Sequence, residues 1–347
     1  MGVVVFLPAF ALSAALVALT IKICRTHGWV AMPRPDRWHQ SKPALFGGIP
    51  IVVTFVGLAA TFVAASDHRA WMVITASIAM FLLGLADDIW HLRPLLKLSL
   101  QLLAALWIVK VLAVHLFINS TVSWLIALLW IVGLTNAFNL LDNMDGLAAG
   151  IGFITAIGLG ILYLHNGVQG LLLLALLGGA SAGFLVFNFY PARIFMGDSG
   201  SLFLGFLLAT TSLLGISRGP RTTTQILAPV LILALPIFDT VFVSLTRRLR
   251  GQPISQGGTD HCSHRLVRLG LEQRRVVLLL YGLAAVSGAV ALEGLTLPVV
   301  DALALNMFWA FSLLLFGIYI FQPGTLADTT HVPNPFPCLE NRSRKIL

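Results

Sequence analysis

Charged side chains are scarce in this chain of 347 residues: Asp, Glu, Lys and Arg together make up 10% of it, against 58% for hydrophobic residues. The length alone would allow two soluble domains, but apolar runs of about 20 residues recur along the chain. Because a helix rises about 1.5 Å per residue, such a run crosses the roughly 30 Å hydrocarbon layer of a bilayer. The sequence therefore predicts an all-α, polytopic membrane helix bundle.

Acidic residues and cysteines are fewer still. The 14 acidic residues stand against 22 Lys and Arg, which gives a net charge of +8. The basic residues are spread over several loops without a groove-reading module, so anionic lipid head groups and anionic substrates are expected as partners rather than nucleic acid. The three cysteines, Cys24, Cys262 and Cys338, are spaced too widely for a metal knuckle, and we assign them no role.

Apolar segments long enough to cross a bilayer predict about 11 transmembrane helices. Their ranges are about 2–23, 47–66, 70–86, 95–115, 121–136, 147–164, 168–188, 200–216, 225–245, 276–294 and 298–321. The odd number places the two termini on opposite sides of the membrane. The first segment lacks a basic region before it and a cleavage pattern after it, so it is expected to be a retained helix.

Basic residues indicate the orientation, because Lys and Arg accumulate in cytoplasmic loops. All but four of the 22 lie on the side of the loop that follows the first segment; the exceptions are Arg69, Lys110, Arg218 and Arg221. The N-terminus is therefore expected outside and the C-terminus in the cytoplasm. Residues 1–322 form the predicted transferase domain, whose outer loops are short, and the Pro-rich tail 323–347 is predicted to be disordered.

Two adjacent carboxylates, Asp87 and Asp88, end the third predicted span in "GLADDIW". A carboxylate at a membrane boundary is costly, so it is a functional hypothesis by default. A divalent cation or a phosphoryl-transfer site uses such a density of oxygens, whereas a solvated helix end is the plainer alternative. The pair predicts a catalytic or metal-related site on the cytoplasmic face.

The stretch "NAFNLLDNMDGLAAG" repeats amide and carboxylate side chains every third residue, at Asn136, Asn139, Asp142 and Asp145. Residues three apart lie on one face of a helix. A polar seam that bonds neighbouring helices is the alternative. Two amides and two carboxylates in register favour a binding site over a seam.

Two further motifs lie on the same predicted face. In "IFMGDSGS", Gly197 lets the backbone approach a ligand and Asp198 is placed to hold a metal, unless it is only a helix cap. In "GGTDHCSHRLVRLG", His261 and His264 stand beside two arginines. A zinc pair is one interpretation of the histidines, but basic groups that face a polyanionic ligand fit the pattern better.

These motifs occur in a fixed order, as "PDRWHQSKPALFGGIPI", "GLADD" with "KLSLQ", "NAFNLLDNMDGLAAG", "ARIFMGDSGSLFLG" and "QPISQGGTDHCSHRLVRLG". Through them, from about residue 29 to residue 275, the chain resembles the polyprenyl-phosphate N-acetylhexosamine-1-phosphate transferase superfamily, glycosyltransferase family 4. The resemblance implies transfer of a sugar-1-phosphate from a UDP-N-acetylhexosamine to polyprenyl (undecaprenyl) phosphate, with release of UMP, to start lipid-linked cell-envelope glycan synthesis. It also implies Mg²⁺ as cofactor with Mn²⁺ as an alternative, a plasma-membrane location with a cytoplasmic site, and a homodimer.

The resemblance also implies roles for individual residues. Asn139 and Asp198 are expected at the metal, and Asp87 and Asp88 are the expected catalytic pair. The expected substrate-binding residues are Lys42, Lys97, Asn136, Asp142, Asp145, Phe195, Gly197, His261 and His264, with Phe195 stacked on uracil. Two positions depart from the family pattern: Asn143 stands where Gly is usual, and Ser263 where a middle His is usual.

The chemistry leaves several alternatives open. A phosphate monoester with a second pKa of about 6 is mostly a dianion at neutral pH, so a strong general base is hardly needed. Single displacement at the β-phosphorus is preferred, with a covalent Asp intermediate as the alternative. A secondary transporter of an anionic metabolite is the rival function, although transporter sites tend to lie at the bilayer midplane, and a non-catalytic scaffold ranks last. The "PALFGGIPI" segment favours an N-acetylglucosamine-phosphate transferring enzyme without identifying the sugar.

Overall fold

The computed structural model describes residues 2–31, 42–112, 120–165, 170–218, 222–252 and 260–321. Within these ranges the regular structure is helical, apart from two isolated β-bridges that join Val30 to Ala44 and Ala44 to Ile194. The helices are α1 (Gly2–His27), α2 (Gly48–Phe62), α3 (His68–Trp90), α4 (Pro94–Leu112), α5 (Ser120–Leu141), α6 (Leu147–His165), α7 (Leu171–Asn188), α8 (Gly197–Arg218), α9 (Thr223–Ile232), α10 (Ala234–Leu249), α11 (Cys262–Arg268), α12 (Gln273–Glu293) and α13 (Val299–Ile320). The predicted all-α class is confirmed, and the tail 323–347 lies outside the described residues.

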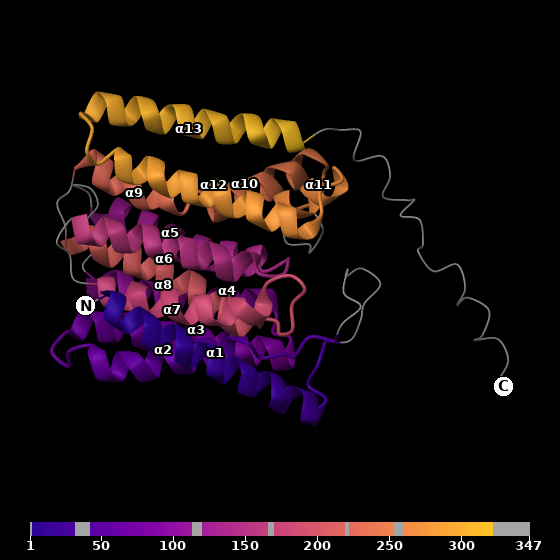
Figure 1. Ribbon diagram of the computed structural model, residues 1–347. Coiled ribbons are helices and arrows are strands. Elements are labelled where there is room, and N and C mark those ends of the chain that lie inside the picture. Colours follow the sequence, from indigo (N-terminus) through magenta and orange to yellow (C-terminus); the bar gives the residue numbers. More distant parts are fainter. Residues whose placement is uncertain are drawn as a thin grey trace.

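The long helices lie side by side along one axis, so the molecule is a single layered bundle (Figure 1). In the described part of the chain, nine helices are long and apolar enough to cross a membrane, and α9 with α10 forms a tenth candidate. The start of α1 and the end of α13 lie at opposite ends of the bundle (Figure 1). The multi-pass membrane architecture is therefore confirmed.

The predicted span 225–245 is not one helix, and this corrects the sequence interpretation. It consists of α9 and α10, which meet at Leu233 with a bend of 67°. Pro236 has no N–H to donate to the carbonyl of Ile232, and its ring would clash with that carbonyl in a straight helix. The apolar segment at 47–66 also forms a helix, α2, of only 15 residues.

The α8 helix is the centre of the bundle, and 94% of its apolar stretch is buried. It packs closely on α3 because Gly84 has no side chain: a Cβ there would lie 2.3 Å from the carbonyl oxygen of Asp198. Small residues at helix contacts allow this approach in membrane proteins. The close packing brings the end of α3 against the start of α8.

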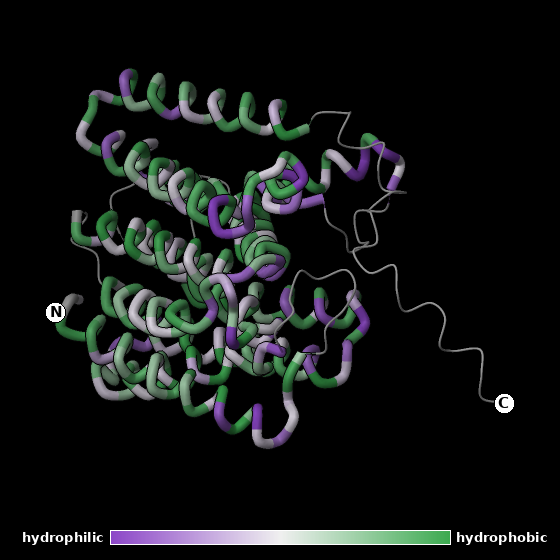
Figure 2. Tube along the Cα trace, turned by 45° about the vertical axis from the view of Figure 1, so that its right-hand side comes forward, coloured by the Kyte–Doolittle hydropathy of each residue, from purple (hydrophilic) through white to green (hydrophobic). Residues whose placement is uncertain are grey.

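Hydrophilic residues collect at the ends of the helices, while the middle of the bundle is hydrophobic (Figure 2). One end contains the last turns of α3 and α5 and the first turns of α4 and α8, and we call it the site end. There the segment 44–48 runs beside 193–196, with Ala44 N donating to Arg193 O and Phe195 N donating to Ala44 O, both at 2.9 Å. Two motifs about 150 residues apart in the sequence thus become neighbours.

Candidate active site

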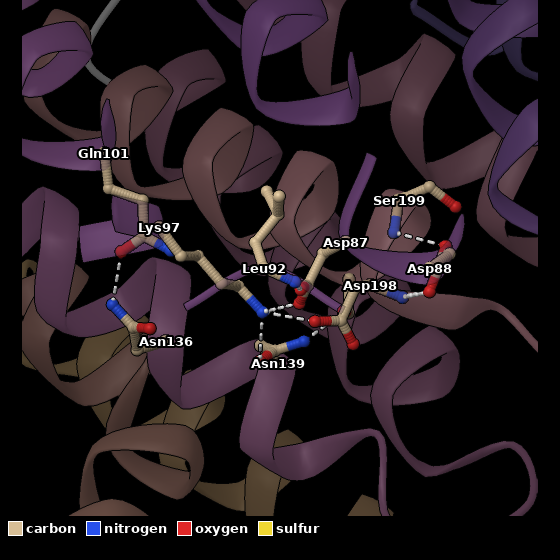
Figure 3. Close-up of polar contacts among 10 residues, drawn as sticks. Asp87, Asp88, Leu92, Lys97, Gln101, Asn136, Asn139, Asp198 and Ser199 are labelled. Carbon is tan, nitrogen blue, oxygen red and sulfur yellow. Dashed lines mark hydrogen bonds and ion pairs between the residues drawn. The ribbon is translucent and has the colours of Figure 1, made fainter. Parts of the chain in front are cut away.

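Lys97, in the first turn of α4, lies at the centre of a charged cluster at the site end (Figure 3). Its Nζ donates to Asp87 Oδ2 at 2.8 Å, to Asn139 Oδ1 at 3.4 Å and to Asp198 Oδ2. The Lys97 side chain is 14% exposed and that of Asp87 15%. Four helices, α3, α4, α5 and α8, therefore meet around one ammonium group.

The local chain path explains why Asp87 and Lys97 face each other. The α3 helix ends at Trp90, and His91 takes a left-handed conformation with φ of 52°, which turns the chain back. Pro94 then begins α4, where a missing N–H does no harm. The turn is held by Leu92 N, which donates to Asp87 Oδ1 at 2.7 Å.

The two adjacent carboxylates point to different partners. Asp88 accepts from the backbone N–H groups of Asp198 at 2.8 Å and Ser199 at 3.0 Å, so it caps the N-terminus of α8. Gly197 has φ of +72°, and a Cβ there would lie 2.7 Å from Asp88 Oδ2. Asp87 faces the lysine, whereas Asp88 and Gly197 position α8; the catalytic role of Asp88 and the substrate contact of Gly197 stay predictions.

The Asn/Asp stripe divides between the cluster and its surroundings. Asn139 donates its Nδ2 to Ser201 Oγ at 2.9 Å, which leaves its Oδ1 toward Lys97. Asn136, one turn earlier, donates to Gln101 Oε1 at 2.7 Å (Figure 3). It also donates to Val132 O at 2.8 Å. Asn139 thus belongs to the charged cluster. Asn136 bonds the neighbouring helix α4 through Gln101, and its contact with substrate stays a prediction.

Asp142 and Asp145 lie in the turn that follows α5. Asp145 is 3% exposed and its Oδ2 accepts from Ala192 N at 2.9 Å, which ties this turn to the segment leading into α8. Gly146 has φ of +76° and closes the turn. Asp142 is partly exposed, so it remains accessible from solvent.

One predicted substrate residue, Phe195, lies within the backbone pairing of 44–48 with 193–196, and another, Lys42, lies just before it. Phe195 is partly exposed and its backbone is held on both sides, by Ala44 O and by Gly47 N, each at 2.9 Å. Lys42 is exposed and comes two residues before Ala44. Both therefore lie at the site end, where a soluble anionic ligand can reach them, and their contacts with substrate stay predictions.

The predicted histidines lie at the start of a short helix: His261 directly precedes α11, and His264 lies within it. His261 Nδ1 lies 2.7 Å from Asp239 Oδ2, and Cys262 N donates to Asp239 Oδ1 at 2.8 Å. The rings of His261 and His264 are 6.2 Å apart. Burial, together with the nearby His261 and Arg268, lowers the pKa of His264 to about 4, so this imidazole is neutral at physiological pH.

The sequence interpretation assigned no role to four residues that the structure places in or beside the site. Nothing in the sequence around Asp239 indicates its bond to His261. Gln101 follows Lys97 by one helical turn, and this spacing in "KLSLQ" was a usable signal. Ser201 carried no local signal. Asp260 belongs to the histidine motif, but its ion pairs with Arg247 at 3.3 Å and with Arg250 at 2.8 Å were not foreseen.

The oxygen atoms around Lys97 fit a hard divalent cation. Asp87 Oδ2, Asn139 Oδ1 and Asp198 Oδ2 already converge on one positive charge, and carboxylate and amide oxygens are suitable ligands for Mg²⁺. Among the described residues, no group of three or more His, Cys, Asp or Glu is arranged to hold a metal. The mixed carboxylate and amide set around Lys97 is the candidate for the predicted metal, and metal binding stays a prediction.

Known proteins similar to this chain share one chemistry in their names. The Glycosyl transferase family 4 model matches residues 70–216. A probable undecaprenyl-phosphate N-acetylglucosaminyl 1-phosphate transferase of Bacillus subtilis is 36% identical over 293 residues, which cover 80% of this chain and 81% of that protein. A decaprenyl-phosphate N-acetylglucosaminephosphotransferase of Mycobacterium tuberculosis is 32% identical over 295 residues, covering 73% and 72%.

A third similar protein matches a shorter part of the chain. A phospho-N-acetylmuramoyl-pentapeptide-transferase of Moorella thermoacetica is 38% identical over 176 residues, which cover 50% of this chain and 52% of that protein. The range matched by the family model includes Asp87, Lys97, Asn139 and Asp198. The chain therefore belongs to glycosyl transferase family 4, the polyprenyl-phosphate N-acetylhexosamine-1-phosphate transferase superfamily.

Proposed function

We propose that this enzyme transfers an N-acetylhexosamine-1-phosphate from a UDP-sugar to a polyprenyl phosphate and releases UMP. The observation that carries the proposal is the convergence of Asp87, Asn139 and Asp198 on Lys97. Two anionic substrates must meet in such a reaction, so a site needs both a fixed cation and oxygen ligands for a mobile one. The names of the similar proteins support the same reaction.

The position of the cluster suits a lipid acceptor. A polyprenyl chain stays in the membrane and its phosphate lies at the head-group plane, so a soluble donor can meet it only at that depth. The cluster lies where α3 ends and α4 and α8 begin. We place the enzyme in the plasma membrane with this end toward the cytoplasm, where nucleotide sugars are made.

Asn139 and Asp198, joined by Asp87, would hold Mg²⁺. When bound, the ion would offset the negative charge of the donor pyrophosphate. The Lys97 ammonium can bind a phosphate oxygen once one of its bonds to a carboxylate is broken. Asp88 keeps Asp198 in place by accepting a hydrogen bond from its backbone N–H.

In the reaction, a phosphate oxygen of the acceptor forms a bond to the β-phosphorus of the donor, and the bond from that phosphorus to UMP breaks. The acceptor is mostly a dianion at neutral pH, because its second pKa is about 6. Asp87 therefore needs only to orient the acceptor or to take its residual proton. An acceptor that is already ionised favours single displacement over a covalent intermediate on an aspartate.

N-acetylglucosamine-1-phosphate is the proposed group, because the B. subtilis and M. tuberculosis proteins are named for it. The test uses purified enzyme, Mg²⁺ and undecaprenyl phosphate with a panel of UDP-sugars, and measures UMP release and the lipid product. UMP release with UDP-N-acetylglucosamine is expected. Lack of a lipid product with every donor would contradict the proposal.

The transporter alternative has its own test. Asp87→Asn is assayed in proteoliposomes for uptake of UDP-sugars and, separately, for sugar-phosphate transfer to lipid. The enzyme is supported if Asp87→Asn loses sugar-phosphate transfer and the wild type shows no measurable uptake. Loss of uptake with persistent transfer would favour a transporter.

A further inference from the structure

A hydrogen bond joins the turn after α5 to the first turn of α11, across 120 positions of sequence. Ser263 Oγ donates to Asn143 Oδ1 at 2.7 Å. Asn143 also donates its Nδ2 to Leu140 O at 2.8 Å, at the end of α5. A carbonyl oxygen only accepts, so the amide nitrogen of Asn143 must face Leu140 and its oxygen must face Ser263.

The placement of α11 depends on such contacts. It has seven residues, well below the roughly 12–15 residues that a helix needs for stability on its own. On one side its start is held by Asp239 of α10, which bonds His261 and Cys262. On the other side Ser263, which is 1% exposed, bonds Asn143.

Each side of the bond carries groups proposed for the nucleotide sugar. Asn143 lies next to Asp142 in the turn, and Ser263 lies next to His264 in α11. Neither Asn143 nor Ser263 has been given a substrate contact. Because the bond joins the two segments, it constrains the distance between Asp142 and His264.

We propose that Asn143 and Ser263 are positioning residues that set the spacing of the turn 142–146 and α11 for donor binding. The inference rests on the proposed function, since the donor is the UDP-sugar. The two residues are also the positions at which the sequence departs from the family pattern, and the structure shows that these departures contact each other. The bond thus joins the two segments that are proposed to contact the donor.

The test is a double-mutant cycle in the purified full-length enzyme, with Ser263→Ala, Asn143→Ala and the double variant. Losing one such hydrogen bond typically costs about 0.5–1.5 kcal/mol, which is about a 2- to 10-fold rise in KM. We expect this rise for the UDP-sugar, with kcat and the KM for undecaprenyl phosphate within about twofold. The double variant should be no worse than the poorer single variant, because both remove the same bond.

Control variants separate positioning from general destabilisation. Ser312→Ala and Asn306→Ala remove the same kinds of side chain from α13, at positions before its end at Ile320, where Arg265 of α11 bonds it, and should leave both KM values unchanged. Ser263→Thr keeps the hydroxyl and should restore the donor KM. Additive effects in the cycle, or an equal loss in kcat and in both KM values, would overturn the proposal.

A readout independent of activity distinguishes failure of this inference from failure of the proposed function. Hydrogen–deuterium exchange of α11 amides should be faster in Ser263→Ala than in the wild type, with α1, on the other side of the bundle, unchanged. If the wild type transfers no sugar phosphate, the proposed function fails, whatever the exchange shows. If exchange rises but the donor KM stays constant, the bond is only structural and the positioning role is wrong.

Discussion

Asp87 and Asp88 are chemically identical neighbours with different partners, and parallel Asp→Asn substitutions should separate their roles. Asp88 accepts two backbone N–H groups at the start of α8. An asparagine has one oxygen, so one of these N–H groups loses its partner and the charge favoured at a helix N-terminus is lost. Together these losses cost about 2 kcal/mol of stability.

Asp87→Asn should have the opposite signature. The asparagine oxygen can still accept from Leu92 N, and Lys97 keeps its bond to Asp198. The variant keeps the Lys97 ammonium and the Asp198 carboxylate, which balance each other. No buried charge is left uncompensated, so stability changes by less than about 1 kcal/mol. A group that orients the acceptor is lost, however, so kcat should fall about 10²- to 10³-fold.

The assay combines UMP release with thermal unfolding of both variants in the same detergent. A stability loss of about 2 kcal/mol in Asp88→Asn should lower the unfolding temperature by several degrees. Asp87→Asn should unfold at the wild-type temperature and be nearly inactive. Equal unfolding temperatures with equal activity losses would refute the division of roles between the two carboxylates.

Three further outcomes follow from the geometry. Gly197→Ala should lower the unfolding temperature, because φ is +72° and the new Cβ would meet Asp88, whereas Gly57→Ala in α2 meets no atom within 4 Å and should be neutral or stabilising. The folded-state pKa of His264 is about 4, below its ordinary 6.5, so stability should be lost as pH falls from 6.5 to 4, and His264→Gln should flatten this loss in pH-dependent unfolding. Chelation by EDTA should abolish UMP release, Mg²⁺ or Mn²⁺ should restore it, and Asn139→Leu should raise the Mg²⁺ concentration needed; activity that survives chelation would contradict a metal role.

Much of the architecture was predictable because hydrophobicity is summed over neighbouring residues. A run such as 147–164 is apolar whatever packs around it, so it predicts a helix that the structure confirms as α6. The three-residue step from Asn136 to Asn139 placed both on one helix face by the same local logic. The break between α9 and α10 was missed because periodicity does not report where a proline leaves a carbonyl without its donor.

The partners of the site residues were not predictable in the same way. Asp87 and Asp88 read alike in sequence, and the turn at His91 decides which of them reaches Lys97. The bond from Asp239 to His261 depends on how α10 leaves the bend at Leu233. Such contacts join segments that only the packed bundle brings together.

The sequence by itself determined that the chain crosses a membrane repeatedly and that its amides and carboxylates lie at helix ends, since both depend on residues close together in the chain. The tertiary structure alone decided that Asp87, Asn139 and Asp198 share one lysine and that Asn143 bonds Ser263. The close packing of α3 on α8 at Gly84, a contact between residues more than a hundred positions apart, gathers the carboxylates of the charged cluster.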